Sequence, residues 1–191
     1  LMKILILSRN INLYSTQSLM EAIRKRGHEV QVYDHLMCNI IVEKNKPKVM
    51  IGLDDLGHFD AVIPRIGASA TAYGAAIIRQ FEAMGVFVTV TAEALLKARD
   101  KLHCMQILSA VGIDVPKTGV SAGDYSAGAV YDRISKERAV IKLLSSTQGL
   151  GVILANSKNQ GISIVEGFHR VGQEILIQEL IQDAKGSDLR V

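Results

Sequence analysis

The stretch Ala139-Val140-Ile141-Lys142-Leu143-Leu144 is followed by Ser145-Ser146-Thr147-Gln148-Gly149-Leu150-Gly151 and then by the apolar run Val152–Ala155. This pattern predicts two strands joined by a loop rich in glycine and hydroxyl side chains. Lys142 is unusual, because a lysine in an apolar strand must either reach solvent past its alkyl stem or find an anion. Backbone N–H groups of a glycine-rich turn can bind phosphate oxygens. The ordinary alternative, a plain hairpin with a solvated lysine, stays open at this point.

Other polar residues stand at the ends of predicted elements in the second half of the chain. Lys101 lies at the start of a predicted helix, and Gln178 and Glu179 lie in the apolar segment Glu174–Ile181, which is predicted to be a strand. Asp188 comes a short way after them. Any one of these residues would mean little. A lysine, a glycine loop, a Gln-Glu pair and an aspartate in this order predict a nucleotide-binding site.

The first half of the chain alternates apolar runs with amphipathic stretches. Lys3–Ser8 is a continuous apolar run, which is typical of a strand buried on both faces of a parallel sheet. An amphipathic helix is expected after it, with Ser15 and Thr16 as candidate N-caps and Gly27 as its end. Further strands are expected over His28–Tyr33, Phe59–Pro64 and Val86–Val90. The stretch between the first two of these strands has no regular pattern.

The second half has a mixed pattern. The segment Ala92–Val111 is expected to be largely helical, with a helix start at Asp100-Lys101, and a further helix is expected over Ile162–Val171. The segment Ser121–Ala129, rich in glycine, serine and alanine, is expected to be a loop or the start of a weak helix. We therefore predict an α/β protein, with an open-sheet α/β domain over residues 1–95 and an α+β domain over residues 96–191.

The chain has 191 residues, of which 48% are hydrophobic, and its 22 Lys+Arg and 19 Asp+Glu give a formal net charge of +3. This composition excludes a disordered or fibrous chain. The positive charges are not concentrated in one block, so direct nucleic-acid binding is not expected. No apolar run approaches the ~20 residues of a membrane span, and no signal peptide is visible. With only two cysteines and no zinc spacing, a cytoplasmic protein without membrane contact is predicted.

The glycine fingerprint of dinucleotide-binding proteins is absent, since Ser8–Leu13 after the first predicted strand contains no glycine. A Walker A loop is absent as well. These absences disfavour a dehydrogenase, because the fingerprint glycines let a helix N-terminus approach the pyrophosphate.

Five motifs of the second half resemble the successive motifs of ATP-grasp enzymes. They are Arg99-Asp100-Lys101, Gly112–Thr118, Val140-Ile141-Lys142, Thr147–Val152 and Gln178-Glu179. Four stretches of the first half are similar to the RimK-type ligases, which modify a ribosomal protein. They are Leu7-Ser8-Arg9, Leu13-Tyr14-Ser15, Asp60–Gly67 and Arg79–Glu82. The resemblance covers the whole chain, and the stretch Asp60–Gly67 is rather specific.

The resemblance implies a Rossmann-like pre-ATP-grasp domain followed by an α+β ATP-grasp domain. Only the central subdomain and the first strand of the C-terminal subdomain would be present. It also implies an ATP-dependent carboxylate–amine ligase that adds glutamate to the C-terminus of a ribosomal protein through an acyl phosphate. Such phosphate transfer needs positioned cations and a metal rather than a protein nucleophile.

For the phosphates of ATP, the resemblance places Lys101 and Lys142 in contact with them, with Lys142 also near the adenine edge. Gly149 and Gly151 would shape the lid over the β- and γ-phosphates. Ser146 stands where a glycine is common in the family, so the mobility of this loop is expected to differ.

For the rest of the nucleotide, the resemblance places Glu179 and Leu180 at the adenine amino group and ring nitrogen, partly through their backbone, with Gln178 beside them. Asp188 would approach the ribose. The implied cofactors are ATP and Mg²⁺ or Mn²⁺. The acidic residues and the asparagine that bind the metal in the family would lie beyond residue 191, so no metal ligand is expected within this chain.

The last residues resemble the opening of a strand. We therefore expect a truncated chain that is inactive by itself. An uncovered strand edge at Leu189 and Val191 would be covered by a further part of the protein or would drive homo-oligomerisation.

Arg9 and Arg65 follow the first and third predicted strands, at the strand ends where ligands bind in open α/β sheets. A carboxylate-terminated acceptor would suit an arginine there, and a surface ion pair is an equally good interpretation. Two other functions stay open. One is an ATP-grasp ligase that acts on a small amino acid or cofactor, and the other is a nucleotide-binding module without catalysis.

Overall fold

The chain divides between Arg99 and Asp100 into two units with separate cores. The structure, a computed structural model, describes residues 1–144 and 151–182. The first unit contains, in chain order, β1 (Lys3–Ser8), α1 (Tyr14–Lys25), β2 (Glu29–Tyr33), β3 (Cys38–Ile41), β4 (Lys48–Ile51), β5 (Asp54–Asp55), β6 (Ala61–Arg65), η1 (Ala68–Ala70), α2 (Thr71–Ala83), β7 (Phe87–Val88) and α3 (Ala92–Arg99).

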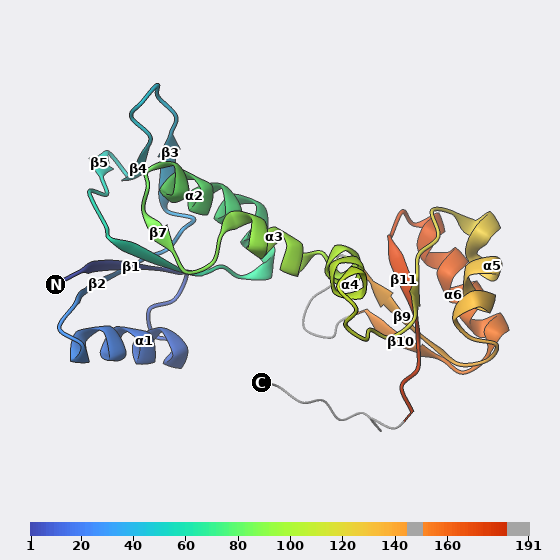
Figure 1. Cartoon of the computed structure of the whole chain (residues 1–191). Coiled ribbons are helices and arrows are strands. Elements are labelled where there is room, and N and C mark those ends of the chain that lie inside the picture. The colour runs from blue at the N-terminus through green and yellow to red at the C-terminus, as the bar shows by residue number, and fades with distance from the viewer. Residues whose placement is uncertain (145–150, 183–191) are drawn as a thin grey trace. The chain divides into compact units, whose positions relative to one another are not determined.

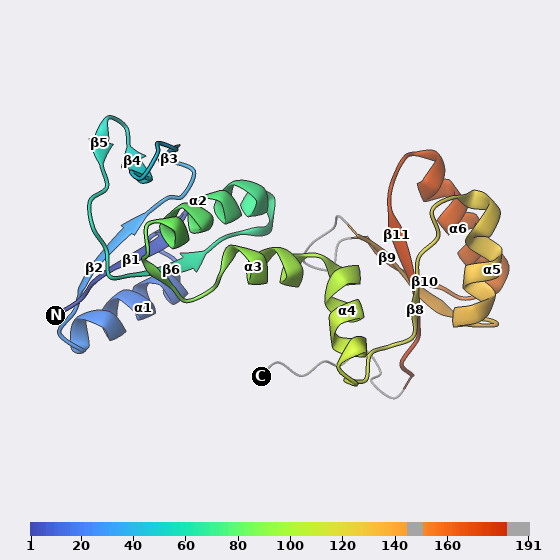
Figure 2. The same ribbon diagram turned by 45° about the horizontal axis from the view of Figure 1, so that its top comes forward.

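The main sheet of the first unit has the strand order β2-β1-β6-β7, and all its neighbouring strands are parallel. Figure 1 shows α1 on one side of this sheet and α2 on the other, and Figure 2 shows the same unit from a second direction. The predicted parallel sheet is therefore confirmed. The order reverses between β1 and β6, because the chain leaves β1 towards β2 and later returns to the opposite side of β1.

β1 is apolar on both faces because both faces are covered by helices. Ile4 and Ile6 pack with residues of α1 in one buried cluster. Leu5 and Leu7 point the other way and pack with residues of α2 in a second cluster. This alternation explains why a two-sided strand has a continuous apolar sequence.

The N-terminus of α1 differs from the prediction. The cap residue is Leu13, with an extended backbone and no side-chain cap, rather than Ser15 or Thr16. The two hydroxyls have other partners instead. The Ser15 Oγ accepts a hydrogen bond from Nη2 of Arg65 at 2.7 Å, and the Thr16 Oγ1 lies 3.1 Å from the Oγ of Ser8. The first turn of α1 is thereby tied to the ends of both β1 and β6.

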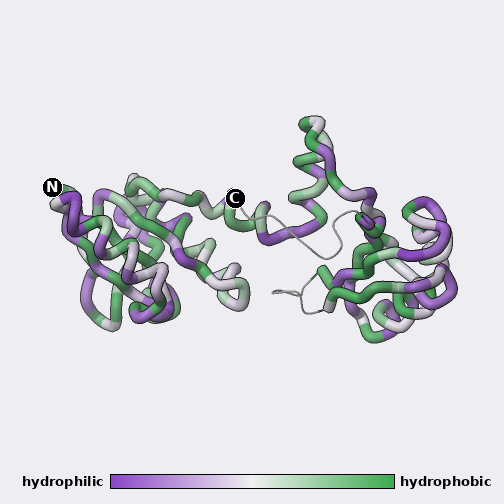
Figure 3. Tube along the Cα trace, turned by 90° about the horizontal axis from the view of Figure 1, so that it is seen from below, coloured by the Kyte–Doolittle hydropathy of each residue, from purple (hydrophilic) through white to green (hydrophobic). Residues whose placement is uncertain are grey.

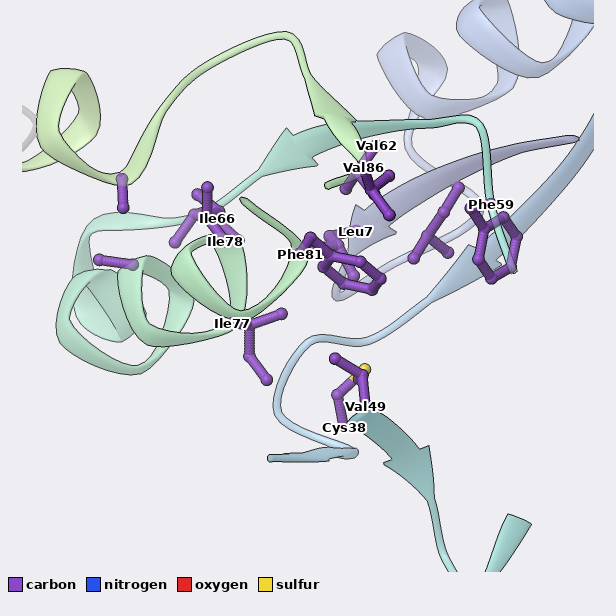
Figure 4. Close-up of a cluster of buried hydrophobic side chains, with 13 residues drawn as sticks. Leu7, Cys38, Val49, Phe59, Val62, Ile66, Ile77, Ile78, Phe81 and Val86 are labelled. Carbon is purple, nitrogen blue, oxygen red and sulfur yellow. The ribbon is translucent and has the colours of Figure 1, made fainter. Parts of the chain in front are cut away.

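A small antiparallel sheet, β3-β4-β5, was not predicted. Its buried residues Cys38 and Val49 join the core beneath α2, as Figure 4 shows. The amide of Gln80 on α2 donates to the carbonyl oxygens of Ile41 and Lys48 at 2.9 and 3.1 Å. These strands are short, so their sequence pattern is weak. Tertiary contacts with α2 stabilise them.

The second unit contains, in chain order, α4 (Lys101–Ala110), β8 (Thr118–Gly119), α5 (Asp124–Ile134), β9 (Ala139–Leu143), β10 (Val152–Ala155), α6 (Lys158–Arg170) and β11 (Ile175–Glu179). Its sheet has the order β10-β9-β11-β8, and all neighbouring strands are antiparallel. The predicted helical segment Ala92–Val111 consists of two helices, α3 and α4, and the helix start predicted at Asp100-Lys101 is confirmed. Asp100 separates them, and its carboxylate caps α4 by accepting from the backbone N–H of His103 at 2.9 Å.

The sheet of the second unit has two chemically different faces. Ile141, Ile175 and Ile177 point towards α5 and α6 and form a buried cluster with residues of both helices. The two helices approach closely, since a Cβ added at Gly161 of α6 would lie 2.1 Å from the ring of Tyr131 on α5. Side chains at the alternate positions of β9 and β11 point to the opposite face.

Figure 3 shows hydrophobic and hydrophilic stretches alternating along the traced chain. In the part of the chain that the structure describes, no helix is long and apolar enough to cross a membrane.

Candidate functional site

Two lysines meet at the end of β9 in the second unit. Lys142 lies on β9, and its Nζ donates to Oε1 of Gln178 at 2.6 Å. Lys101 lies at the first position of α4, and its Nζ donates to the carbonyl oxygens of Leu143 and Leu144 at 3.3 and 2.8 Å. The two residues predicted from separate motifs are therefore brought to one place, directly before residues 145–150.

The electrostatics of this place favour an anion. Burial lowers the pKa of Lys142, and the nearby Lys101 ammonium lowers it further. Over residues 1–144 and 151–182, Lys142 forms no ion pair with a carboxylate. A phosphate group would relieve the repulsion between the two ammonium groups and would supply charge-assisted hydrogen bonds.

The strand β11 presents the other predicted residues. Gln178 is buried, with 5% of its surface exposed, and its side chain contacts Lys142 rather than solvent. The Glu179 carboxylate accepts a hydrogen bond from the backbone N–H of Lys117 at 2.7 Å, and the Glu179 N–H donates to the Lys117 carbonyl at 2.9 Å. Leu180 follows the last residue of the strand. Glu179 is thereby held at a fixed position beside Lys117.

Gly151 has a structural reason to be glycine. Its φ is +74°, and an added Cβ would lie 2.5 Å from the side chain of Leu143 on β9. Its carbonyl oxygen accepts a hydrogen bond from the Leu143 N–H at 3.0 Å. Gly149 and Asp188, which were also predicted to belong to the ATP site, lie outside the described residues, as do Leu189 and Val191.

The first unit has a pocket of about 470 Å³ at the carboxyl ends of β1 and β6. Arg9 and Arg65 line it, as predicted from their positions after two strands, and Arg99 at the end of α3 lines it too. The Nη1 of Arg9 lies 3.5 Å from the Ser69 Oγ, and the Nη2 of Arg99 donates to the Ile66 carbonyl at 2.6 Å. This is the place in the sheet where the strand order reverses, and ligands bind at such places in open α/β sheets.

The charge in this pocket is positive and uncompensated. No Asp or Glu lines it, and none of the three arginines forms an ion pair within the described ranges. The surface ion pair that was an equally good interpretation of Arg9 and Arg65 is therefore not seen. Planar guanidinium groups bind carboxylates and phosphates through paired hydrogen bonds, so the pocket suits an anionic ligand.

His35 lies near this pocket, after β2. Its side chain is fully buried, and its ring nitrogens have no hydrogen-bond partner among the described residues. Burial lowers the pKa of His35, the nearby Asp34 carboxylate opposes this shift, and Arg9 adds to it. The imidazole is therefore held neutral beside an arginine.

Arg99 and Thr118 are site residues that the sequence analysis left without a role. Arg99 belongs to the motif Arg99-Asp100-Lys101, and Thr118 belongs to the motif Gly112–Thr118. The resemblance of these motifs to those of ATP-grasp enzymes is the sequence feature that could have indicated both residues. Arg99 reaches the pocket because α3 ends there. Thr118 lies on β8 directly opposite Gln178 on β11 and accepts a hydrogen bond from its amide at 2.9 Å. Within residues 1–144 and 151–182, no three His, Cys, Asp or Glu side chains gather to hold a metal ion.

Comparisons with known proteins identify the family of the chain. Residues 2–95 match the RimK PreATP-grasp domain, and residues 98–191 match the RimK-like ATP-grasp domain. The two matches together define an ATP-grasp protein whose first domain is of the pre-ATP-grasp type. The chain belongs to the RimK family, and the expected fold class and resemblance are confirmed.

Similar sequences include a protein named probable alpha-L-glutamate ligase from Vibrio cholerae serotype O1, which is 46% identical over 189 residues. That alignment covers 99% of this chain and 63% of the relative. A protein of the same name from Vibrio vulnificus is also 46% identical, with the same coverage. The chain therefore spans less than two thirds of the length of these relatives.

Similar structures show the same fold. The RimK domain protein ATP-grasp from Sphaerobacter thermophilus has a TM-score of 0.71 and 24% identity, over 94% of this chain and 64% of that one. D-alanyl-alanine synthetase A from Vibrio cholerae has a TM-score of 0.68 and 13% identity, over 94% of this chain and 59% of that one.

Proposed function

We propose that the protein is an ATP-dependent ligase that adds glutamate to the C-terminal carboxylate of a ribosomal protein, and that it acts in the cytoplasm. The observation that carries the proposal is the convergence of Lys101 and Lys142 at one strand end, in a chain of the RimK family. The names of the relatives support glutamate as the amine substrate. The N-terminal stretches of the sequence, Asp60–Gly67 above all, support the ribosomal acceptor by their resemblance to RimK-type ligases.

In the proposed complex, ATP binds in the second unit. Lys101 and Lys142 contact its phosphates, with Gly149 and Gly151 beside them, while Glu179, Leu180 and Asp188 hold the adenine and ribose end. The Lys142 ammonium suits a polyphosphate, because it forms no ion pair with a carboxylate in the described part of the chain. Lys101 lies close enough to lower the pKa of Lys142, so the two lysines together make this place positive. Mg²⁺ or Mn²⁺ would neutralise charge on the phosphates when bound, and its ligands are proposed to lie outside this chain.

The proposed reaction has two steps. A carboxylate oxygen of the acceptor attacks the γ-phosphorus of ATP, the bond to the bridging oxygen breaks, and ADP leaves. The amino group of glutamate then attacks the carbonyl carbon of the acyl phosphate, forms the C–N bond and displaces phosphate. The positive charge of Lys101 and Lys142 would stabilise the negative charge that moves between the phosphate oxygens.

The arginine pocket of the first unit is the proposed site for the acceptor. Arg9 and Arg65 would bind the terminal carboxylate, because guanidinium groups pair with carboxylates in a planar, bidentate geometry. Arg99 lines the same pocket and would add a third donor group. A carboxylate held in this way would have a fixed orientation, which lowers the entropic cost of its reaction.

The test uses the full-length protein with ATP, Mg²⁺, glutamate and peptides that end as ribosomal proteins do. Mass spectrometry should show a peptide heavier by one glutamate residue, with release of one ADP per addition. Arg65→Met should raise the KM for the peptide about tenfold or more and leave the affinity for ATP unchanged. Modification of a small amino acid instead of the peptide would favour another ATP-grasp ligase. ATP binding without any product would favour a binding module.

A further inference from the structure

Three polar side chains form a row across the sheet of the second unit, on the face opposite α5 and α6. Thr118 of β8 lies directly opposite Gln178 of β11 in the strand register. Gln178 lies opposite Val140 of β9, and Lys142 is two residues further along β9 on the same face. Diagonal neighbours of this kind are within reach of long side chains. Met105 of α4 lies against the row, with its Sδ 3.6 Å from the Gln178 Nε2.

The hydrogen bonds along this row run in one direction. The Thr118 hydroxyl donates to the Pro116 carbonyl at 2.7 Å, so its oxygen is left as an acceptor. The Gln178 Nε2 donates to that oxygen at 2.9 Å, which turns the amide oxygen towards β9. The Gln178 Oε1 then accepts from the Lys142 ammonium at 2.6 Å. Each group has its donor or acceptor set by the group before it, so Thr118 decides the orientation of the amide.

The acceptor that holds Lys142 is neutral. A carboxylate at position 178 would hold an ammonium more strongly but would also cancel its charge. An amide supplies a hydrogen bond and leaves the positive charge available to a second, anionic partner. Gln178 is buried, so its amide has little freedom to turn, and the location of the ammonium group is correspondingly restricted.

We propose that Thr118 and Gln178 are positioning residues, which hold the Lys142 ammonium group in place for a phosphate and do not themselves bind the nucleotide with their side chains. The choice of phosphate as the anion rests on the function proposed above. The hydrogen-bond row itself does not depend on that function. The same row explains why a buried glutamine follows three apolar residues in β11.

The first measurement needs no nucleotide. The pKa of Lys142 in the full-length protein is followed by NMR of ¹³C-labelled lysine, with assignment by the Lys142→Arg variant. Thr118→Val removes the hydroxyl acceptor at nearly constant shape, so the Gln178 amide can turn and the Lys142 pKa should fall. Thr118→Ser keeps the hydroxyl and should restore the wild-type value. Gln178→Glu places a carboxylate against the ammonium and should raise the pKa. Among the described residues, Lys101 of α4 is the charged group that shifts the Lys142 pKa in wild type, and it is unchanged in all three variants.

The second measurement is calorimetric titration of a non-hydrolysable ATP analogue. Thr118→Val should weaken its affinity about two- to tenfold, as expected for one lost hydrogen bond. Thr118→Ser should stay within about twofold of wild type. Gln178→Glu should weaken affinity at least about tenfold, since it neutralises the charge that meets the phosphate. The loss of affinity at high pH should move to higher pH in Gln178→Glu, because affinity needs the charged amine.

The two proposals can fail separately. Equal Lys142 pKa values in Thr118→Val and Thr118→Ser would overturn the positioning role, whatever the nucleotide does. Equal affinities in these two variants, with a lower thermal midpoint in Thr118→Val alone, would show a purely structural role and would overturn it as well. A third outcome is that the variants show the expected changes in Lys142 pKa but the wild-type protein does not bind the ATP analogue. This outcome would overturn the proposed function and leave the positioning role supported.

Discussion

β1 and β9 occupy similar places in their units, each between two neighbouring strands, but they differ in what their faces do. β1 is buried on both faces, since α1 covers Ile4 and Ile6 and α2 covers Leu5 and Leu7. β9 is buried on the side of Ile141, while its other side carries Lys142. A strand covered on both faces has no position for a functional side chain within its length. The pocket residues Arg9 and Arg65 accordingly stand directly after β1 and at the last position of β6. A strand covered on one face can carry a functional group within its length.

The largest effect is expected from placing a lysine in β1. β9 contains a lysine at position 142, but β1 has no face that could hold one. Ile6 is completely buried and packs in a cluster of apolar side chains. Ile6→Lys should lower the free energy of unfolding by more than about 4 kcal/mol, because an unpaired charge would be buried. That loss is comparable with the whole stability of a domain.

Urea denaturation followed by circular dichroism measures this change. Ile6→Val is the matched control and should cost only about 0.5–1.5 kcal/mol. If the Ile6→Lys protein unfolds cooperatively with the same urea midpoint as wild type, then β1 and β9 do not differ in their tolerance of a lysine.

The reverse change in β9 should affect binding rather than folding. Lys142→Met should weaken binding of the ATP analogue by about 1.5–3 kcal/mol, the contribution of a charge-assisted hydrogen bond. Its unfolding free energy without nucleotide should stay within about 1 kcal/mol of wild type. Removing a half-buried charge stabilises the fold, and leaving the Gln178 oxygen without its donor offsets that gain.

Calorimetry and thermal unfolding separate these two quantities. Lys158 is a suitable control, because it is paired with Asp132 at 2.7 Å on α5 and lies at the start of α6. Lys158→Met should leave nucleotide affinity unchanged. Identical affinities in Lys142→Met and wild type would remove Lys142 from the proposed ATP site.

Two glycines of the second unit differ in whether another residue could replace them. Gly151 has a backbone conformation that requires glycine, and Gly167 does not. Gly151→Ala should lower the free energy of unfolding by about 1–3 kcal/mol, because φ is +74° and Leu143 occupies the space of a Cβ. Gly167 lies within α6, and nothing lies within 4 Å of an added Cβ. Gly167→Ala should raise the free energy of unfolding by about 0.5–1 kcal/mol. Chemical denaturation measures both free energies of unfolding. A change of the same sign in the two variants would contradict the difference between the two glycines.

The smallest effect concerns pH and the first unit. Burial lowers the pKa of His35 in the folded protein, so the unfolded chain takes up a proton first as pH falls. The stabilising contribution of neutral His35 is fully present above pH ~6.5 and is lost as pH falls below it, by at most about 1.4 kcal/mol per pH unit. His35→Leu should flatten the dependence of the urea midpoint between pH 7 and 5. An unchanged slope in His35→Leu would assign the pH dependence to other groups.

Much of the molecule follows from local sequence. The apolar run of β1 predicts a two-sided strand, and the run Ala139–Leu144 with its lysine predicts a strand that carries a charge. The parallel sheet of the first unit and the strands β10 and β11 were also predictable, since apolar runs bounded by turn residues identify them. The order of motifs along the chain indicates a nucleotide site, because those residue types supply cations and backbone donors for phosphate.

Other features depend on contacts between distant residues, which no local pattern contains. β3, β4 and β5 are short, so their local pattern is weak, and contacts of β3 and β4 with α2 stabilise the sheet. The serine and threonine expected to cap α1 have partners on β1 and β6 instead, because folding brings Ser8 and Arg65 to the same place. The break at Asp100 is different, since an aspartate is a preferred N-cap and the helix start at Lys101 follows from local sequence.

The sequence by itself determined which residues carry charge and where polar residues interrupt the apolar strands. Tertiary structure alone decided which of these residues meet. Thr118 and Gln178 are 60 residues apart and become neighbours only through the register of β8 on β11. Arg99 likewise joins Arg9 and Arg65 only because α3 ends at the carboxyl edge of the parallel sheet. Side-chain chemistry is local information, whereas strand register and helix packing are set by the burial of the whole core.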